Sequence, residues 1–246
     1  MFDFNDQKAL VTGAASGIGL GIAQLLGRSG ASLIVVDRNA QGLLAADLPE
    51  DCIRVYGDIT ERDVREEILS YGPIPLSIQN AGIADTEGGF LLGKDQEYLE
   101  VFQTNLFAPW SLSREIAKEL IRSKQSGSMV MISSLHAHHV RRMPAYSTSK
   151  AALEMLIREM AWELGPYGIR VNGVVPGGVR TKLTATGSHA RESMFPLGRR
   201  QTLEDIAKMC AVLLDNTLSG QTTGETIKVD GGLDLFSWHS RGDERE

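Results

Sequence analysis

Residues 12–19 read Thr-Gly-Ala-Ala-Ser-Gly-Ile-Gly and stand between an apolar run and the start of a helical pattern. Glycines at 13, 17 and 19 allow a tight turn and bring the backbone close to a pyrophosphate. The N–H groups and the dipole of a helix N-terminus stabilise such a charge. The next apolar run ends at Asp37, where a carboxylate can accept hydrogen bonds from an adenosine ribose. These features predict a dinucleotide site between a first strand and a first helix.

Asp37 also favours one coenzyme over the other. Its charge repels the 2′-phosphate of NADP and bonds the free 2′-hydroxyl of NAD. Arg38 follows directly, and its guanidinium can bind a phosphate, stack on adenine or face water. We expect the carboxylate to dominate, so the sequence favours NAD, and NADP less.

Strand-like and helical segments alternate along the chain. Short, mostly β-branched apolar runs, typical of strands covered on both faces, lie at 8–11, 32–37, 53–57, 76–79, 128–133, 170–175 and 226–229. Helical patterns lie between them at 17–29, 61–70, 95–124, 145–164 and 203–214. The order predicts an α/β fold: a doubly wound, Rossmann-like parallel sheet of these seven strands with helices on both faces.

One domain is expected over residues 1–246, because no linker or repeat interrupts this order. The irregular segment at about 181–202 is interpreted as a substrate lid, and the polar residues at about 240–246 as a loose tail.

Composition narrows the classes of partner and compartment. The net charge of −6, without blocks of Lys and Arg, argues against nucleic acid or an anionic membrane as the main partner. The two cysteines, Cys52 and Cys210, form neither a disulfide framework nor a metal motif, which favours a reducing cytoplasm. The uncharged stretch 9–27 is broken by glycines and therefore indicates a strand, turn and helix rather than a membrane span; the acidic N-terminus does not resemble a signal peptide.

A tyrosine and a lysine stand four residues apart in Tyr146-Ser147-Thr148-Ser149-Lys150, downstream of Ser134. On a helix this spacing places both side chains on one face. A nearby ammonium favours phenolate and lowers the pKa of a tyrosine from its usual value of about 10. The pair is therefore a candidate acid/base near neutral pH.

The helix predicted at 95–124 contains Pro109. Proline has no N–H, so the carbonyl four residues earlier, that of Asn105, loses its helical partner and needs a water or a ligand. For Pro109 itself, a kink that only improves packing is an equally good interpretation.

With T-G-x-x-x-G-x-G and Y-x-x-x-K both present, the chain resembles the short-chain dehydrogenase/reductase family, in its branch of about 250 residues. Asn80-Ala81-Gly82, Ser133-Ser134, Pro176-Gly177 and Val229-Asp230-Gly231-Gly232 match further family elements in order. The resemblance makes Tyr146 the acid/base, Lys150 its activator, Ser134 the donor to the substrate oxygen, and Asn105 the holder of a water through its main-chain carbonyl.

The resemblance also implies the ligand-binding residues. Coenzyme contacts are expected from Gly13, Ser16, Gly17, Ile18, Gly19, Asp37, Asp58, Ile59, Asn80, Ala81, Gly82, Tyr146, Lys150, Pro176, Gly177, Val179 and Thr181. Substrate contacts are expected from Ser134, His136 and Tyr146. Because the gap from Ser134 to Tyr146 is one residue shorter than in many members, Ser133 remains an alternative catalytic serine.

The resulting hypothesis is an NAD-dependent oxidoreductase of a secondary alcohol, such as a polyol, sugar or hydroxy acid. The alternatives are an NADPH-preferring keto-reductase of acyl thioesters or steroids and a non-catalytic cofactor-sensing protein. No metal is expected, since His136, His138 and His139 lack a carboxylate or cysteine at ligand spacing. The resemblance implies a homo-oligomer, a tetramer or dimer, and Ala151, Ala152, Met155 and Ala161 could lie on its interface or face the sheet.

Overall fold

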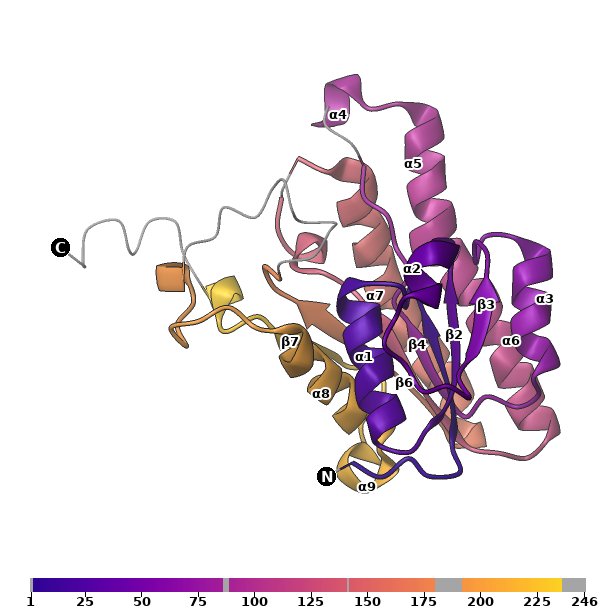
Figure 1. The fold of residues 1–246 in the computed structure, drawn as a ribbon. Helices are drawn as coiled ribbons and strands as arrows, with labels where there is room; N and C mark the ends of the chain where they lie inside the picture. Colours follow the sequence, from indigo (N-terminus) through magenta and orange to yellow (C-terminus); the bar gives the residue numbers. More distant parts are fainter. Residues whose placement is uncertain (1, 86–88, 141, 180–191, 236–246) are drawn as a thin grey trace.

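Seven parallel strands form one sheet (Figure 1). The structure is a computed structural model, and it describes residues 2–85, 89–140, 142–179 and 192–235. The strand order is β3-β2-β1-β4-β5-β6-β7. The strands are β1 (Lys8–Thr12), β2 (Ser32–Asp37), β3 (Ile53–Tyr56), β4 (Leu76–Gln79), β5 (Gly127–Ile132), β6 (Ile169–Pro176) and β7 (Thr226–Val229). The order reverses between β1 and β4, the place where doubly wound sheets bind ligands.

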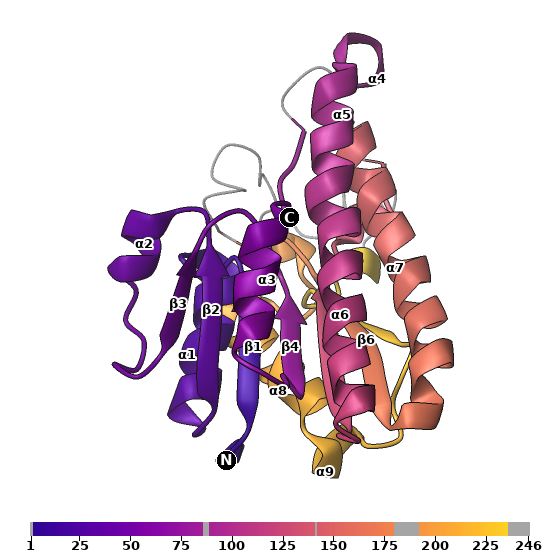
Figure 2. The same ribbon diagram turned by 90° about the vertical axis from the view of Figure 1, so that its right-hand side faces the viewer.

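Helices cover both faces of the sheet (Figures 1 and 2). On one face pack α1 (Gly17–Arg28) and α8 (Leu203–Leu214). On the other pack α3 (Arg62–Ser70), α6 (Ala108–Arg122) and α7 (Pro144–Leu164). Shorter helices are α2 (Ala40–Leu44), α4 (Gly89–Leu92), α5 (Asp95–Phe102) and α9 (Asn216–Ser219).

The two layers of the core follow from the alternation of side chains along each strand. Ala9 and Val11 of β1 contact the α1 and α8 layer, whereas Leu10 between them contacts the α3, α6 and α7 layer. All three are fully buried. Strands covered on both sides need apolar residues at every position, which explains why their sequences show little polar alternation.

The structure confirms the predicted fold class, and each predicted strand ends within one residue of its observed bounds. The single helix predicted at 95–124 is wrong. That segment consists of α5, a π-helical turn η1 (Gln103–Phe107) and α6, which follow one another along one axis (Figure 2). The short helices α2, α4 and α9 were not predicted.

Only the end of the predicted lid is described, since 180–191 lie outside the described residues, as does the predicted tail. Residues 192–202 begin with a 3-10 turn, η5 (Glu192–Met194). Phe195 is then buried in the fold, and the N–H of Leu197 donates to the carbonyl of Gly231. This part of the segment therefore packs against the turn that follows β7.

Candidate active site

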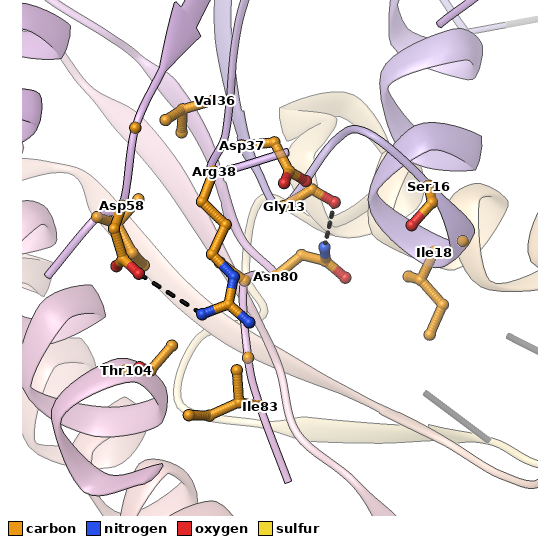
Figure 3. Close-up of a pocket in the computed structure, with 15 residues that line it drawn as sticks. Gly13, Ser16, Ile18, Val36, Asp37, Arg38, Asp58, Asn80, Ile83 and Thr104 are labelled. Carbon is orange, nitrogen blue, oxygen red and sulfur yellow. Dashed lines mark hydrogen bonds and ion pairs between the residues drawn. The ribbon is translucent and has the colours of Figure 1, made fainter. Parts of the chain in front are cut away.

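A cavity opens at the carboxyl ends of the central strands, where the strand order reverses (Figure 3). Ten residues expected to bind coenzyme line it: Gly13, Ser16, Gly17, Ile18, Asp37, Asp58, Ile59, Asn80, Ala81 and Gly82. Val36, Arg38, Gly57, Ile83 and Thr104 complete the wall.

The glycine-rich turn has the backbone that its sequence predicts. Gly13 and Gly17 adopt positive φ angles of 68° and 59°, which residues with a Cβ rarely adopt. The turn is braced from β4, since the Asn80 amide donates to the carbonyls of Thr12 at 2.9 Å and Gly13 at 3.1 Å. The Thr12 hydroxyl in turn accepts from the N–H of Asn80 and of Ala81.

Gly19 does not line the cavity. A Cβ at Gly19 would lie 2.1 Å from the carbonyl oxygen of Gly13. Gly19 therefore serves the close packing of α1 under the turn. Ser16, in contrast, lines the cavity and makes no side-chain capping bond to α1.

Asp37 is held at the rim by the backbone around it. Its Oδ2 accepts from the N–H of Ala15 at 2.9 Å, and its Oδ1 accepts from the N–H of Asn39 at 2.8 Å. The Arg38 guanidinium reaches to the Asp58 carboxylate at 3.7 Å (Figure 3). The rim thus combines a fixed carboxylate with a guanidinium already paired to a second carboxylate.

The donors and acceptors present suit a dinucleotide. A helix N-terminus faces the cavity, and a carboxylate stands where a ribose diol would bond. Beyond β6, the side-chain amide of Gln201 lies 2.8 Å from the position that a Cβ of Gly177 would occupy. This amide is buried without a hydrogen-bond partner. It lies beside Gly177, one of the expected coenzyme contacts, just after β6 ends at Pro176. Val179 is buried, and Thr181 lies outside the described residues.

The three predicted catalytic side chains meet where β5 ends against α7. The Ser134 hydroxyl lies close enough to the phenol of Tyr146 to lower its pKa. One turn further along α7, the Lys150 ammonium lies 5.7 Å from the centre of the Tyr146 ring and donates to the carbonyl of Ile132 at 2.8 Å. Lys150 is buried, at 4% exposed.

Ser133 points away from this group. Its hydroxyl donates to the buried carboxylate of Glu154 at 2.7 Å, and the Nε2 of His138 lies 3.1 Å from the same oxygen. Of the two serines, Ser134 is therefore the one placed on Tyr146. Glu154 was not identified from the sequence, although it stands four residues after Lys150 and so on the same face of the helix.

Asn105 joins the coenzyme cavity to the catalytic helix from within the π-helical turn. Its Oδ1 accepts from the N–H of Ile83 at 2.9 Å, and its Nδ2 donates to the carbonyl of Ile83 and to the hydroxyl of Ser149. A π-helical turn leaves carbonyls out of the regular ladder and is often found at functional sites. The kink considered for Pro109 is thus a change in helix type.

Burial shifts the pKa values of Tyr146 and Lys150 in opposite directions. Desolvation raises the pKa of Tyr146, and the hydrogen bond from Ser134 offsets this rise in part. Desolvation lowers the pKa of Lys150 to about 8. The lowered Tyr146 pKa expected from its spacing to Lys150 is not found: burial raises this pKa, and Ser134 rather than Lys150 opposes the rise.

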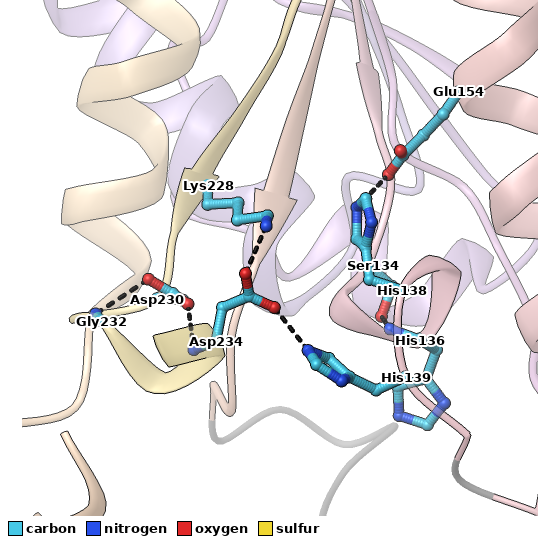
Figure 4. Close-up of polar contacts among 9 residues, drawn as sticks. All are labelled: Ser134, His136, His138, His139, Glu154, Lys228, Asp230, Gly232 and Asp234. Carbon is cyan, nitrogen blue, oxygen red and sulfur yellow. Dashed lines mark hydrogen bonds and ion pairs between the residues drawn. The ribbon is translucent and has the colours of Figure 1, made fainter. Parts of the chain in front are cut away.

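The histidines after β5 lie in three different environments (Figure 4). The ring of His136 meets the ring of Tyr146 edge to face, with centroids 5.2 Å apart. His138 contacts Glu154, and the Nε2 of His139 lies 2.5 Å from the carboxylate of Asp234, which also pairs with Lys228. Of these three histidines, only His136 is therefore in ring contact with Tyr146.

Among residues 2–85, 89–140, 142–179 and 192–235, no three His, Cys, Asp or Glu side chains gather in a way that could hold a metal ion. Within the same residues, every helix is too short or too polar to cross a membrane.

Comparison with known proteins shows the family to which the chain belongs. A family model described as "Enoyl-(Acyl carrier protein) reductase" matches residues 13–234. L-xylulose reductase of Mus musculus is 36% identical, over 92% of this chain and 96% of that protein. D-erythrulose reductase of Gallus gallus is 32% identical over 94% and 96%, and Carbonyl reductase [NADPH] 2 of Sus scrofa is 32% identical over 94% and 97%.

A solved structure titled "short chain dehydrogenase/reductase family protein" superposes with a TM-score of 0.87 at 32% identity, covering 96% of this chain and all of its own. Fold, site geometry and relatives agree: the chain belongs to the short-chain dehydrogenase/reductase family and is an oxidoreductase.

Proposed function

We propose that the chain interconverts a secondary alcohol and a ketone with NAD, and that Tyr146 is the acid/base. The observation that carries the proposal is the contact between Ser134 and Tyr146, with Lys150 on the same helix face and Asn105 and Gly82 beside it. The group lies between the coenzyme cavity and the loop after β5.

The residues that line the cavity would hold NAD, which would supply the hydride acceptor and, in its oxidised form, a positive charge. The chain's own residues handle the proton. In the oxidation direction the Tyr146 oxygen takes the proton of the substrate hydroxyl, while the Ser134 hydroxyl donates to the substrate oxygen. A positioned base of this kind contributes typically about 10²–10⁴-fold in rate. Lys150, held by the Ile132 carbonyl, favours the phenolate by its charge.

The preference for NAD rests on Asp37. Both of its oxygens are held by backbone N–H groups at the rim, so its charge remains where a 2′-phosphate would lie. The pig relative carries NADPH in its name, so the preference must be measured rather than carried over.

A small polyol or sugar, or its keto form, is the proposed substrate class. Two of the relatives are named for the ketoses xylulose and erythrulose. His136 stands against Tyr146 with a polar ring that can bond a second hydroxyl of such a substrate.

Replacing Tyr146 with Phe tests the mechanism. Turnover of L-xylulose or D-erythrulose should fall at least a hundredfold, while the Kd for NADH, followed by fluorescence, stays within about twofold of wild type. The matched control is Tyr167→Phe, in the 3-10 turn just after the end of α7, which should leave both unchanged. A Tyr146→Phe enzyme with near-normal turnover would disprove the mechanism.

Titration with NADH and NADPH tests the coenzyme. NADH should bind the wild type at least tenfold more tightly, and Asp37→Ser should reduce that ratio by removing the repelling charge, since one well-placed charge typically changes affinity about tenfold or more. Tighter binding of NADPH by the wild type would refute the NAD preference.

A keto-reductase of acyl thioesters is the second candidate, favoured by the description of the matching family model. A higher kcat/KM for an acetoacetyl thioester with NADPH than for any ketose with NADH would select it.

We also propose a homo-oligomer, a dimer or tetramer, formed through the face that α5, η1 and α6 share with α7. A groove there is lined by apolar side chains from both sides, among them Leu99, Phe107, Trp110, Met155 and Leu156. Of the alanines considered for this face, Ala152 lines the groove, whereas Ala161 is buried in the core.

A cytoplasmic location is proposed from the cysteines. Cys52 and Cys210 are unpaired and buried, and desolvation raises the pKa of Cys52 to about 11. Both are therefore inert thiols suited to a reducing compartment.

A further inference from the structure

The N-terminus of the catalytic helix is capped by a residue from another part of the chain. Helix α7 starts at Pro144, and the residue before it, Met143, provides no side-chain cap. The carboxylate of Asp85 takes this role. Its Oδ2 accepts from the N–H of Ala145 at 2.9 Å, and its Oδ1 accepts from the N–H of Tyr146 at 2.9 Å. Asp85 thus holds Tyr146, the proposed acid/base, through the backbone N–H of that residue.

The loop that carries Asp85 also forms part of the wall of the coenzyme cavity. Residues 80–85, here the 80–85 loop, begin with Asn80, which is bonded to the glycine-rich turn at Thr12 and Gly13. Midway, Ile83 is held on both its N–H and its carbonyl by Asn105. At its end, Asp85 holds Tyr146. The loop therefore connects the coenzyme turn, the π-helical turn and the catalytic helix.

We propose that Asp85 is a positioning residue for the reaction, which sets the place of Tyr146 relative to the coenzyme cavity. A displacement of about 1 Å at a reacting group can cost up to about 10²-fold in rate. A link that fixes Tyr146 to the cavity wall is therefore expected to raise kcat. Because the link runs through the backbone N–H of Tyr146, it fixes the start of the side chain while Ser134 holds its end.

The charge of Asp85 has a second, separable effect. A carboxylate at a helix N-terminus offsets the positive end of the helix dipole. Within the described residues, three polar groups face the Tyr146 side chain. They are the Ser134 hydroxyl, the His136 imidazole on η2 (Leu135–Ala137) and the Lys150 ammonium, which lies on α7 like Tyr146. Removing the Asp85 charge leaves these in place and makes phenolate formation easier.

Two variants separate position from charge. Asp85→Ala removes both acceptors, and kcat should fall roughly ten- to a hundredfold. The Kd for NADH should stay within about twofold, because Asp37 and the glycine-rich turn are unchanged. Asp85→Asn keeps the shape and one acceptor oxygen, so kcat should recover to within about tenfold of wild type. Its pH profile for alcohol oxidation should shift the acid limb down by roughly half a pH unit, the size of a helix-terminus charge effect.

Asp215 offers a matched control. Its Oδ1 caps the short helix α9 by accepting from the N–H of Thr217 at 2.7 Å, at the end of the molecule away from the cavity (Figure 1). Asp215→Ala and Asp215→Asn should lower the melting temperature as a lost cap does, with kcat and the pH profile unchanged.

This inference rests on the proposed role of Tyr146, and the two can fail separately. An active Tyr146→Phe enzyme removes the role itself. If Tyr146→Phe is inactive but both Asp85 variants keep kcat within twofold and the wild-type acid limb, the positioning role of Asp85 is refuted. If Asp85→Ala does not fold, Asp85→Asn decides alone: a lowered acid limb supports the proposal, and an unchanged one overturns it.

Discussion

Lys150 is an ammonium group in a place that disfavours charge. Burial lowers its pKa to about 8 from 10.5. The unfolded chain therefore binds a proton between pH 8 and 10.5 that the folded chain does not, and stability rises with pH through this window. The buried charge opposes folding fully below about pH 8, by about 3 kcal/mol for such a shift. The proposed role of Lys150 in the reaction would account for a buried charge that stability disfavours.

Lys150→Met should consequently inactivate the enzyme and remove the free-energy cost of burying the Lys150 charge. The substitution also leaves the Ile132 carbonyl without its hydrogen-bond donor, which costs about 1–3 kcal/mol. The net change in the free energy of unfolding at pH 7 is therefore small. The way this free energy changes with pH is what tests the prediction. The free energy of unfolding of the variant relative to wild type should fall by about 2–3 kcal/mol from pH 7 to pH 10. Urea unfolding at one protein concentration measures it. The exposed Lys118→Met serves as control, and a difference independent of pH would contradict the prediction.

We expect the π-helical turn between α5 and α6 to depend on Pro109, which follows it directly in α6. Pro109 has no N–H to give to the carbonyl of Asn105, and the chain adopts the wider turn just before it. Pro109→Ala supplies that N–H and favours a regular helix, which would rotate Asn105 away from Ile83 and Ser149. We expect a higher melting temperature and a kcat lowered roughly tenfold, since misplacement by about 1 Å has effects of this order.

Pro166→Ala, in the turn that ends α7, is the control for the loss of a proline. It lies far along the helix from Tyr146 and should leave kcat unchanged. Hydrogen exchange at Asn105 and its neighbours distinguishes the two outcomes. A Pro109→Ala enzyme with wild-type kcat and a regular helix there would show that the π-helical turn serves packing alone.

The elements that the sequence predicted have apolar patterns long enough to recognise, whereas the missed helices are too short to show one. The strands are buried on both faces, so their apolar runs stand out, as do the amphipathic patterns of α1, α7 and α8. Helices α2, α4 and α9 have four or five residues, too few for a period of 3.6 to show. The π-helical turn needs tertiary contacts to select it. In the site, short motifs indicated Ser134, Tyr146 and Lys150, but the Asp85 cap joins residues 60 apart and leaves no local signal.

The face formed by α5, η1, α6 and α7 carries large apolar side chains that are exposed to solvent. Leu99, Phe107 and Met155 are 63%, 44% and 53% exposed along the groove, which is costly for an isolated chain in water. Burying such a patch against a second copy of itself is the usual solution, because two-fold symmetry makes one patch complementary to itself. α7 also carries Tyr146 and Lys150, so an oligomer would hold the catalytic helix from its outer side.

Met155→Glu should therefore separate the proposed oligomer. A carboxylate in an apolar interface must lose its water without gaining a partner, and Glu159 on the same groove adds repulsion. Light scattering should show the mass halving, from 53.6 to 26.8 kDa if the wild type is a dimer, because one two-fold face joins the copies in pairs. Leu44→Glu, an equally apolar and 70% exposed site on α2, should leave the mass unchanged. A wild-type mass of 26.8 kDa, or a Met155→Glu chain that keeps the wild-type mass, would exclude this face as the interface. If the mass falls and kcat falls with it while NADH still binds, the partner chain stabilises the position of α7, and assembly and catalysis depend on the same helix.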